Sequence, residues 1–394
     1  MKIFFSAGEP SGDQHAAHLI EELRRRDPNI ECCGFGGPEM EKVGLRSIFR
    51  LTDLAVMGFV RVVPMLRKFF RVLGLAEKFF AEEKPDAVVL VNFPGFNWRV
   101  AKRAKAAGIP VFFYLPPQLW AWASWRIKRV HKWIDYVLCG LPFEHDWYSK
   151  QGVNSEYVGH PFYDEVAEKQ LDEEFVAEWK TSESATHPRT VGVLPGSRRH
   201  EVEKNWPIML PVLRNIAAKH PDVRFLVAGF NDEFVAHCKE LMAPEDENLP
   251  LTFFTGKTPE IIEAADFCYM VSGSVSLEML ARAKPVAVVY KVFRFGRIVQ
   301  RLMMKVDYIS LPNLVADREV MPEWIVSDLI EQDITAMTAQ LDTWLSNPEE
   351  LQRSREELIA LRDSVMQTGA SRMTADAILA RLPQEETIEH RRAA

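Results

Sequence analysis

The chain has 394 residues, of which 47% are apolar and 26% charged, a composition typical of a soluble globular protein long enough for two domains. Its formal net charge of −7 argues against a dedicated nucleic-acid binder, because such a protein needs excess cations to displace the counterions of a phosphate backbone. Five cysteines, with only Cys32 and Cys33 close together, predict free thiols in the cytosol, and without about eighteen consecutive apolar residues any membrane contact must be peripheral.

The first half of the chain alternates short apolar runs with helical segments. Strands are predicted at 2–6, 32–35, 87–91, 111–114, 136–139 and 155–158. The loop after the first strand carries Ser11 and Asp13, which can cap a helix that ends near Arg26. Its glycines permit close backbone approach, but G-x-G-x-x-G is absent, so an ordinary strand-to-helix loop explains the pattern equally well.

Two predicted helices, at 64–82 and 291–305, combine an apolar stripe with cations. Such helices can lie on an anionic lipid surface, with rings in the interface and cations at the headgroups. Packing of the first helix on the sheet is the equal alternative, and the second could instead meet a partner subunit. The residues assigned to lipid contact are Arg67, Phe69, Phe70, Arg71, Arg294, Arg297 and Arg301.

Polar residues follow the aliphatic strand at 87–91, which we expect to be buried on both faces. Asn92 and Asn97 bracket this turn, and the carboxyl end of a central strand is the usual place for catalytic groups. After the strand at 111–114, prolines and tryptophans at 116–122 either stiffen an acceptor pocket or bury a large turn. The cations that follow favour the pocket.

The second half repeats the alternation after a hinge at 159–161 and a polar linker at 171–189. Strands are predicted at 191–194, 224–228, 251–254, 267–270 and 286–289. We therefore expect an α/β protein in which two doubly wound Rossmann-like domains face a cleft, with C-terminal helices. The expected segments are domains at 1–170 and 188–345, helices at 349–382 and a polar tail at 383–394.

Two strand ends in the second half predict a cradle for a phosphorylated ligand. Arg198 offers a guanidinium fork that matches phosphate oxygens, and the turn at 272–274 precedes a helix whose first N–H groups attract an anion. Glu278 could accept hydrogen bonds from a ribose, or merely complete a helix cap. The residues assigned to this cradle are Gly196, Ser197, Arg198, Ser272, Gly273, Ser274 and Glu278.

Other chemistries find little support in the sequence. Neither H-E-x-x-H nor a cysteine pair with zinc spacing occurs, so we expect no metal site. The G-x-S-x-G elbow of acyl hydrolases is also missing. Transfer from an activated phosphate ester remains, in which the protein holds a diphosphate and stabilises its charge as it leaves.

The ordered motifs of the chain resemble those of lipid-A-disaccharide synthases over nearly all of residues 2–382. They are SAGEPSGD at 6–13, GGPEM at 36–40, LAVMG at 54–58, QLWAW at 118–122, LPFE at 141–144, LPGSR at 194–198, SGS with LE at 272–278, and SLPNL at 310–314. The resemblance implies an inverting, metal-independent glycosyltransferase of the two-Rossmann-domain (GT-B) type that uses no cofactor. It also implies a cytoplasmic homodimer, peripheral to the inner membrane, with exchanged carboxyl-terminal segments.

The resemblance further implies the reaction and the roles of the domains. The family joins UDP-2,3-diacylglucosamine to 2,3-diacylglucosamine 1-phosphate, and the products are the β-1,6-linked disaccharide and UDP. The first domain then takes the acceptor and lipid, with Ser11 in its site loop, and the second takes the UDP-sugar through Arg198 and residues 272–278. Asn313 belongs to a second required polar set, which we also assign to UDP.

The chain departs from this family at Asn92, where an aspartate is usual. A general base contributes about 10²–10⁴-fold to such a displacement, and a neutral amide can orient the acceptor hydroxyl but cannot take its proton. Either Asp13, His15 or Glu9 replaces the base, or the enzyme is slow, or the chain has changed its task. A noncatalytic relative that binds nucleotide sugar and lipid is therefore the second hypothesis, and a UDP-sugar 2-epimerase is a weaker third.

Overall fold

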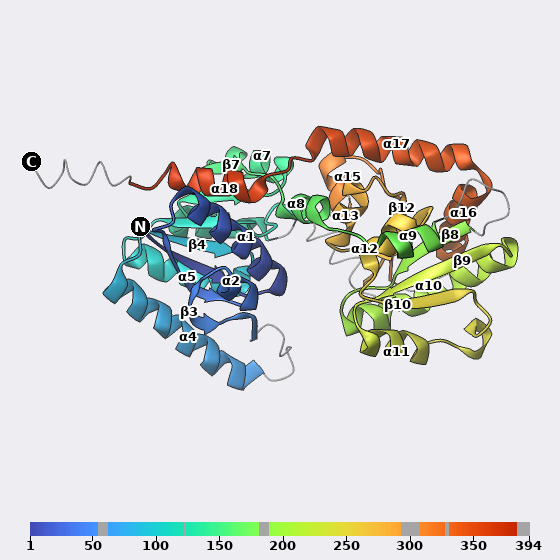
Figure 1. Ribbon diagram of the computed structural model, residues 1–394, viewed down its shortest axis with the longest axis horizontal. Coiled ribbons are helices and arrows are strands. Elements are labelled where there is room, and N and C mark those ends of the chain that lie inside the picture. The colour runs from blue at the N-terminus through green and yellow to red at the C-terminus, as the bar shows by residue number, and fades with distance from the viewer. Residues whose placement is uncertain (54–61, 122, 181–188, 293–307, 328–330, 384–394) are drawn as a thin grey trace, which may run out of the picture. The chain divides into compact units, whose positions relative to one another are not determined.

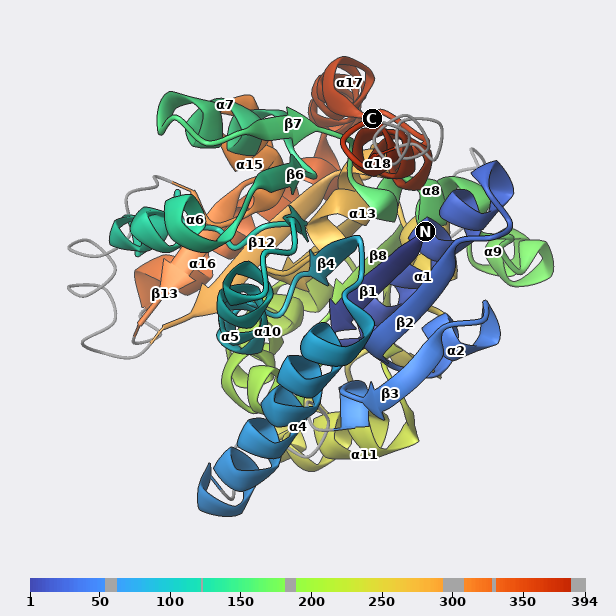
Figure 2. The ribbon, with the colours of Figure 1, turned by 90° about the vertical axis from the view of Figure 1, so that its left-hand side faces the viewer.

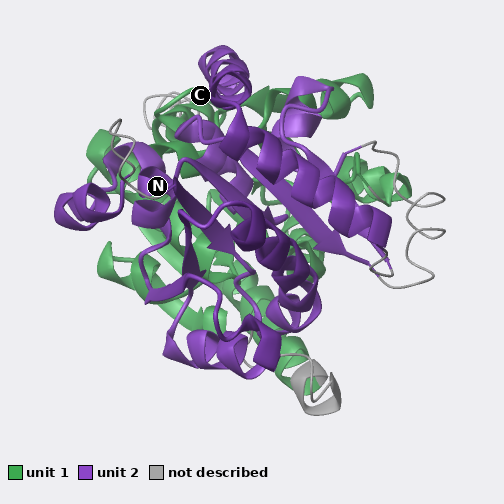
Figure 3. Ribbon diagram, turned by 90° about the vertical axis from the view of Figure 1, so that its right-hand side faces the viewer, with its two compact units in different colours: residues 1–164, 367–394 green, residues 165–366 purple. Residues whose placement is uncertain are grey.

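The computed structural model describes residues 1–53, 62–121, 123–180, 189–292, 308–327 and 331–383, with the backbone alone for 62–66. The chain forms two compact units, residues 1–164 with 367–394 (unit 1) and residues 165–366 (unit 2), coloured separately in Figure 3. Each unit contains a parallel sheet with helices packed on it, which confirms the predicted α/β class (Figure 1). The predicted cleft stays a prediction.

Unit 1 is built on a seven-stranded parallel sheet in the order β3-β2-β1-β4-β5-β6-β7. One face packs against α4, α5 and α6, and the other against α1 and α18 (Figure 2). The strands are β1 (Lys2–Ala7), β2 (Glu31–Gly36), β3 (Arg46–Arg50), β4 (Ala87–Val91), β5 (Val111–Tyr114), β6 (Tyr136–Cys139) and β7 (Ser155–Tyr157). The helices are α1 (Pro10–Arg26), α2 (Pro38–Lys42), α4 (Val62–Glu83), α5 (Pro94–Ala106), η1 (Ser124–Arg126), α6 (Ile127–Trp133), α7 (Pro142–Lys150), α8 (Pro161–Glu168), which runs into unit 2, and α18 (Ala370–Leu379).

Unit 2 has a six-stranded parallel sheet in the order β10-β9-β8-β11-β12-β13, with an apolar cluster on each face. The strands are β8 (Arg189–Leu194), β9 (Val223–Gly229), β10 (Leu251–Thr255), β11 (Phe267–Val271), β12 (Val286–Lys291) and β13 (Glu323–Val326). The helices are α9 (Glu173–Trp179), α10 (Arg199–Lys219), α11 (Asp232–Glu240), η2 (Pro244–Asp246), α12 (Thr258–Ala264), α13 (Val275–Ala281), α15 (Leu311–Ala316), α16 (Glu331–Ser346) and α17 (Pro348–Val365).

The structure corrects the sequence prediction at two edge strands and one linker. β3 was missed because Arg46 and Arg50 make it polar, and β13 because it starts with a glutamate and three of its four residues are only half-buried. Part of the predicted linker at 171–189 is the helix α9, which Asp172 caps by accepting a hydrogen bond from the Phe175 N–H at 3.1 Å. Its Phe175 packs against Phe254, so this charged segment still buries an aromatic ring.

The helices predicted together at 349–382 belong to different units. α17 lies in unit 2, whereas α18 returns to unit 1 and packs against α1. Asp164 fixes the start of α18, because its carboxylate accepts hydrogen bonds from the N–H groups of Gly369 (2.6 Å) and Ala370 (2.9 Å). Ile378 of α18 is fully buried in the core beneath α1, and this burial explains why the helix joins the first unit.

The close approach of β1 and β2 depends on Gly34, which has a φ of +135°. A Cβ atom at this position would lie 2.2 Å from the Phe5 carbonyl oxygen. We expect Gly34→Ala to lower the free energy of unfolding by at least about 2 kcal/mol, as measured by urea denaturation. Gly74→Ala on α4, where a Cβ meets nothing within 4 Å, is the control and should be neutral or stabilising by up to about 1 kcal/mol. Equal midpoints for the two variants would contradict this account.

Candidate active site

The carboxyl ends of β1 and β4 are joined by a buried amide. Asn97, with no exposed surface, accepts a hydrogen bond from the Ser6 hydroxyl at 2.7 Å, and its Nδ2 donates to the Asn92 carbonyl at 2.7 Å. Asn92 and Phe93 both adopt left-handed backbone, with φ of +46° and +48°. Gly8 makes room for this turn, because a Cβ there would lie 2.2 Å from the Phe93 ring. The fold therefore holds a strained turn at the predicted catalytic position.

This turn places Asn92 beside Glu9. The Asn92 Nδ2 donates a hydrogen bond to Glu9 Oε2 at 3.1 Å, and Glu9 is only partly buried at the start of α1. A carboxylate can only accept here, so the amide nitrogen of Asn92 must face it. This contact places Asn92, the residue that departs from the family pattern, beside Glu9, one of the three candidate bases.

Asp13, predicted as a catalytic residue, is hydrogen-bonded to the start of α2. Its carboxylate accepts hydrogen bonds from the N–H groups of Gly37 (2.7 Å), Glu39 (2.9 Å) and Met40 (3.2 Å), and only 2% of its surface is exposed. Asp13 therefore caps α2, whose first N–H groups would otherwise be buried without acceptors. Its neighbour Ser11, by contrast, is exposed in the first turn of α1.

His15, another candidate base, lies on α1 with 5% of its surface exposed, and its ring centroid is 6.2 Å from that of His160. Burial, together with the nearby His15 ring, lowers the pKa of His160 to about 3. His160 Nδ1 accepts a hydrogen bond from the Phe162 N–H at 3.2 Å, as a neutral ring can. Burial makes His15 a less accessible base than Glu9.

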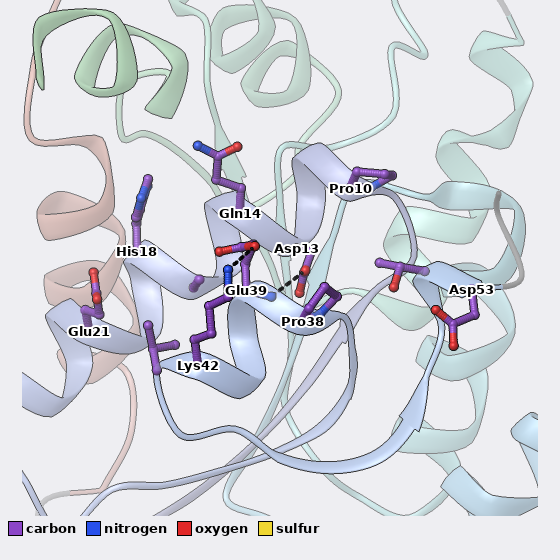
Figure 4. A pocket seen from close by; sticks show the side chains of 12 residues that line it. Pro10, Asp13, Gln14, His18, Glu21, Pro38, Glu39, Lys42 and Asp53 are labelled. Carbon is purple, nitrogen blue, oxygen red and sulfur yellow. Dashed lines mark hydrogen bonds and ion pairs between the residues drawn. The ribbon is translucent and has the colours of Figure 1, made fainter. Parts of the chain in front are cut away.

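A surface pocket of about 830 Å³ lies between α1, α2 and the residues that follow β3 (Figure 4). Asp13 and Thr52 form part of its lining, and Gln14, His18 and Lys42 contribute polar groups from the two helices. Gly37 borders Asp13 and Thr52 so closely that a Cβ would lie within 2.6 Å of both side chains. Pro10, which follows Glu9 in the sequence, is part of the lining of this pocket.

In unit 2, the end of β8 delivers Gly196, Ser197 and Arg198 to the start of α10. Gly196 has a φ of +126°, which permits the sharp turn, and the Arg198 side chain is 70% exposed. Glu201 Oε2 accepts hydrogen bonds from the N–H groups of Ser197 (3.0 Å) and Arg198 (3.1 Å). The backbone groups that could bind an anion at this helix start are thus engaged by a carboxylate.

The end of β11 lies next to the end of β8, since Met270 pairs with Leu194 in parallel register. Gly273 and Ser274 are exposed there, while Ser272 donates a hydrogen bond from its hydroxyl to the Ile309 carbonyl at 3.4 Å. The two loops of the predicted cradle therefore start side by side. This adjacency follows from the parallel sheet, which delivers neighbouring strand ends to one edge.

Two residues assigned to UDP are engaged within the fold. Glu278 is 6% exposed and forms an ion pair with Arg282 Nε at 3.0 Å; burial raises its pKa, and Arg282 opposes that rise. Asn313 is fully buried; its Nδ2 donates to Met321 O and Glu323 Oε2, and its Oδ1 accepts from the Val320 and Met321 N–H groups. The amide of Asn313 thus uses its hydrogen-bonding positions within the fold, where it fixes the segment at 320–323, and its assignment to UDP stays a prediction.

Glu323 is a residue that the sequence analysis missed. Its carboxylate accepts hydrogen bonds from the N–H groups of Ile309 (2.8 Å) and Ser310 (3.0 Å). It thereby holds the SLPNL turn beside Ser272. A single acidic residue at the start of a short edge strand carries no local signal for such a role.

The residues predicted to contact lipid differ in their exposure. Arg67, Phe70 and Arg71 are exposed on α4, with 61% of Phe70 accessible. Phe69 is half-buried and packs against Phe96, with ring centroids 5.5 Å apart, so its assignment to lipid stays a prediction. The remaining three, Arg294, Arg297 and Arg301, lie outside the described residues.

Comparisons with known proteins place the chain in a family. The family model described as lipid-A-disaccharide synthetase matches residues 3–380. A lipid-A-disaccharide synthase of Nitrosococcus oceani is 34% identical over 382 residues, which cover 96% of each chain, and one of Myxococcus xanthus is 34% identical over 97% of this chain and 98% of its own.

Solved structures of low sequence identity share the fold. The UDP-GlcNAc 2-epimerase from Neisseria meningitidis, bound to UDP-GlcNAc, gives a TM-score of 0.60 at 11% identity and covers 96% of this chain and 98% of its own. A lipopolysaccharide outer core galactosyltransferase in its apo form gives a TM-score of 0.56 at 14% identity and covers 97% of this chain and 100% of its own.

The capping role of Asp13 can be tested by stability. We expect Asp13→Ala to lower the free energy of unfolding by about 1–3 kcal/mol, because the N–H groups of α2 lose their acceptor. The control is Asp53→Ala, which removes an exposed carboxylate from the same pocket and should change stability by less than about 0.5 kcal/mol. Chemical denaturation measures both, and an unchanged midpoint for Asp13→Ala would refute the cap.

Proposed function

The chain belongs to the lipid-A-disaccharide synthase family, and we propose that the two sheet edges described above each hold one substrate of its reaction. The reaction is a hexosyl transfer from UDP-2,3-diacylglucosamine to 2,3-diacylglucosamine 1-phosphate, which gives the β-1,6-linked disaccharide and UDP. The observation that carries this function is the family match over residues 3–380. The assignment of individual residues to the reaction is our proposal.

In this proposal, the UDP-sugar binds at the ends of β8 and β11 in unit 2. The exposed Arg198 guanidinium and the exposed turn at Gly273 and Ser274 are the contacts for the diphosphate. The phosphates compete with Glu201 for the N–H groups of Ser197 and Arg198, so binding moves that carboxylate away. Arg198 then stabilises the charge that develops on UDP as the bond to the sugar breaks.

The acceptor binds at the edge of unit 1, and Glu9 is the general base. The acceptor hydroxyl attacks the anomeric carbon and gives its proton to the Glu9 carboxylate, while the electrons of the breaking bond leave with UDP. Asn92 is held beside Glu9 and orients the same hydroxyl. The polar pocket that begins at Pro10 is the proposed site for the acceptor sugar.

The noncatalytic alternative rests on the missing aspartate at position 92. Glu9 argues against this alternative, because its Oε2 lies 3.1 Å from the Asn92 Nδ2 and its carboxylate can replace the usual base. The 2-epimerase alternative has only the shared fold in its favour, at 11% identity. The family match lies with the synthases instead.

We expect the purified protein to convert the two lipid substrates to disaccharide and UDP, measured in detergent micelles by product release. Glu9→Gln should lower kcat by about 10²–10⁴-fold, because the amide keeps an oxygen for Asn92 but cannot accept a proton. The binding of UDP should not change. Failure of the natural chain to form any product would refute the synthase activity.

A second substitution tests whether a carboxylate at position 92 can replace Glu9 as the base. In the Glu9→Gln background, Asn92→Asp restores a carboxylate at the position usual in the family and should recover at least about tenfold of the lost rate. In the natural background, Asn92→Asp sets two carboxylates side by side, so one pKa rises and the gain should be small. If Glu9→Gln retains most of its activity, another residue is the base.

We also propose that unit 1 attaches to an anionic membrane through its basic face, defined as α4, α5 and α6. These helices pack side by side on one face of the sheet, and α5 and α6 contain no acidic residue. Their exposed cations include Arg67, Lys68, Arg71, Lys78, Arg99, Lys102, Lys128, Arg129 and Lys132. Phe70 and Trp125, each 61% exposed, adjoin them. Within the described residues, no helix combines the length and apolarity that crossing a bilayer requires.

Cytoplasmic location at the inner membrane and a homodimer stay predictions of the family resemblance. Exposed aromatic rings near cations are the pattern that lies at a lipid interface, where each cation near an anionic surface contributes about 1 kcal/mol. This magnitude makes the basic face sufficient for reversible attachment.

The double substitution Arg67→Glu and Arg71→Glu should weaken binding to phosphatidylglycerol-containing vesicles by at least about tenfold, measured by co-sedimentation. Phe70→Ser should weaken binding as well, but with less dependence on salt. Lys239→Glu on α11, an exposed cation outside the basic face, is the control and should leave binding unchanged. Equal binding by all variants would place the membrane contact elsewhere.

A further inference from the structure

The loop between β5 and η1, defined here as residues 115–121, is anchored to α7 at two points. Trp120 Nε1 donates a hydrogen bond to Glu144 Oε1 at 3.0 Å, and the Tyr148 hydroxyl donates to the Pro117 carbonyl at 2.6 Å. Glu144 and Tyr148 are four residues apart and therefore lie on one face of the helix. The Trp120 ring also meets Phe143 edge to face, with centroids 4.7 Å apart.

The same loop starts beside the Asn92 turn. β5 pairs with β4, and the Asn92 N–H donates a hydrogen bond to the carbonyl of Tyr114, the last residue of β5, at 3.2 Å. Leu115 then turns away in left-handed backbone, with a φ of +54°. The 115–121 loop therefore starts directly beside the edge that carries Asn92 and Glu9.

Between its two anchors the loop exposes one amide. Leu119 and Trp120 are 2% and 7% exposed, whereas Gln118 is exposed at the tip. The anchors fix the backbone on both sides of Gln118, at the Pro117 carbonyl and at the Trp120 indole. A primary amide offers both a donor and an acceptor, which suits the hydroxyl groups of a sugar.

The Glu144 carboxyl is buried, with 5% of its surface exposed. Burial raises its pKa to about 7, although Trp120 and the N–H groups of Leu141 and Gly140 favour the ionised form. Burial also raises the pKa values of Tyr148 on α7 and Cys139 on β6, so both stay protonated at neutral pH. His160, whose ring lies against Gly140, has a pKa of about 3 and stays neutral. Glu144 is thus the group in this cluster whose charge changes near neutrality.

We propose that Glu144 is a positioning residue for the sugar acceptor: through Trp120, its carboxylate fixes the 115–121 loop so that Gln118 hydrogen-bonds the acceptor sugar. This inference rests on the proposed acceptor site in unit 1 and extends it to residues that do not touch the reacting atoms. Neither α7 nor this loop belongs to the UDP-sugar site of unit 2, so the effect is selective for the acceptor.

The sign of the pH dependence follows from the ionised form, which accepts the Trp120 hydrogen bond. As the pH falls through about 7, Glu144 gains a proton, its carboxylate is lost and the loop loosens. We therefore expect acceptor affinity to fall below about pH 7 in the natural protein. Glu144→Gln should abolish this step, because an amide does not titrate in that range.

The test measures acceptor binding by isothermal titration calorimetry in detergent, and steady-state KM values for both substrates. Trp120→Phe, Glu144→Gln and Gln118→Ala should each weaken acceptor binding by about tenfold and leave the KM for the UDP-sugar within about twofold. Asp146→Asn, on the exposed side of α7, is the matched control and should behave as the natural protein. Thermal denaturation shows whether each variant is folded.

The outcomes separate this inference from the proposed function. If the natural protein forms no product but binds the acceptor with the expected step near pH 7, the reaction is refuted and the positioning role stands. Parallel changes in the KM of both substrates, a pH step that persists in Glu144→Gln, or no acceptor binding by the natural protein would each overturn the inference. Gln118→Ala keeps both anchors, so it tests the contact even where the anchor variants fail to fold.

Discussion

The arrangement of the amino-terminal site depends on one buried amide, that of Asn97. Its carbonyl accepts a hydrogen bond from the Ser6 hydroxyl, and its nitrogen donates one to the Asn92 carbonyl, so it ties the ends of two central strands to the first turn of a helix. Two neighbouring residues are thereby kept in left-handed backbone, which non-glycine residues rarely adopt. From this backbone the Asn92 side chain donates its hydrogen bond to Glu9. The chemistry proposed for this edge is a consequence of that constraint.

The sequence predicts most of the fold, because strands buried on both faces are recognisable as short aliphatic runs and the helices between them are amphipathic. β4, with five buried residues, is an example of a strand that only a central position in a parallel sheet explains. The elements that were missed lie where this signal fails. β3 is polar because it is an edge strand, and α9 is short and charged because it buries little beyond Phe175 and Trp179.

The site was harder to predict than the fold. Sequence motifs identify which polar residues matter, but they do not distinguish residues that meet a ligand from residues that hold the loops. Asp13 and Asn313 both lie in such motifs. The Asp13 carboxylate accepts from backbone N–H groups, and the Asn313 amide bonds backbone groups and the Glu323 carboxylate. Arg198 and Gln118 lie in similar motifs and remain exposed. Contacts over long sequence separations, such as Glu9 with Asn92 or Glu144 with Trp120, decide this difference, and local patterns do not contain them.

The return of α18 to unit 1 has a consequence for the connectivity of the chain. Unit 2 is, in topological terms, an insertion within unit 1, and the exit and re-entry points are held together by the hydrogen bonds from Gly369 and Ala370 to Asp164. A short bridge could therefore join these points and yield the first unit as an independent polypeptide. Conversely, a truncation after α17 would remove α18, which belongs to the core of unit 1 although it comes last in the chain. The apolar surface of α1 would then be uncovered without any change in residues 1–164.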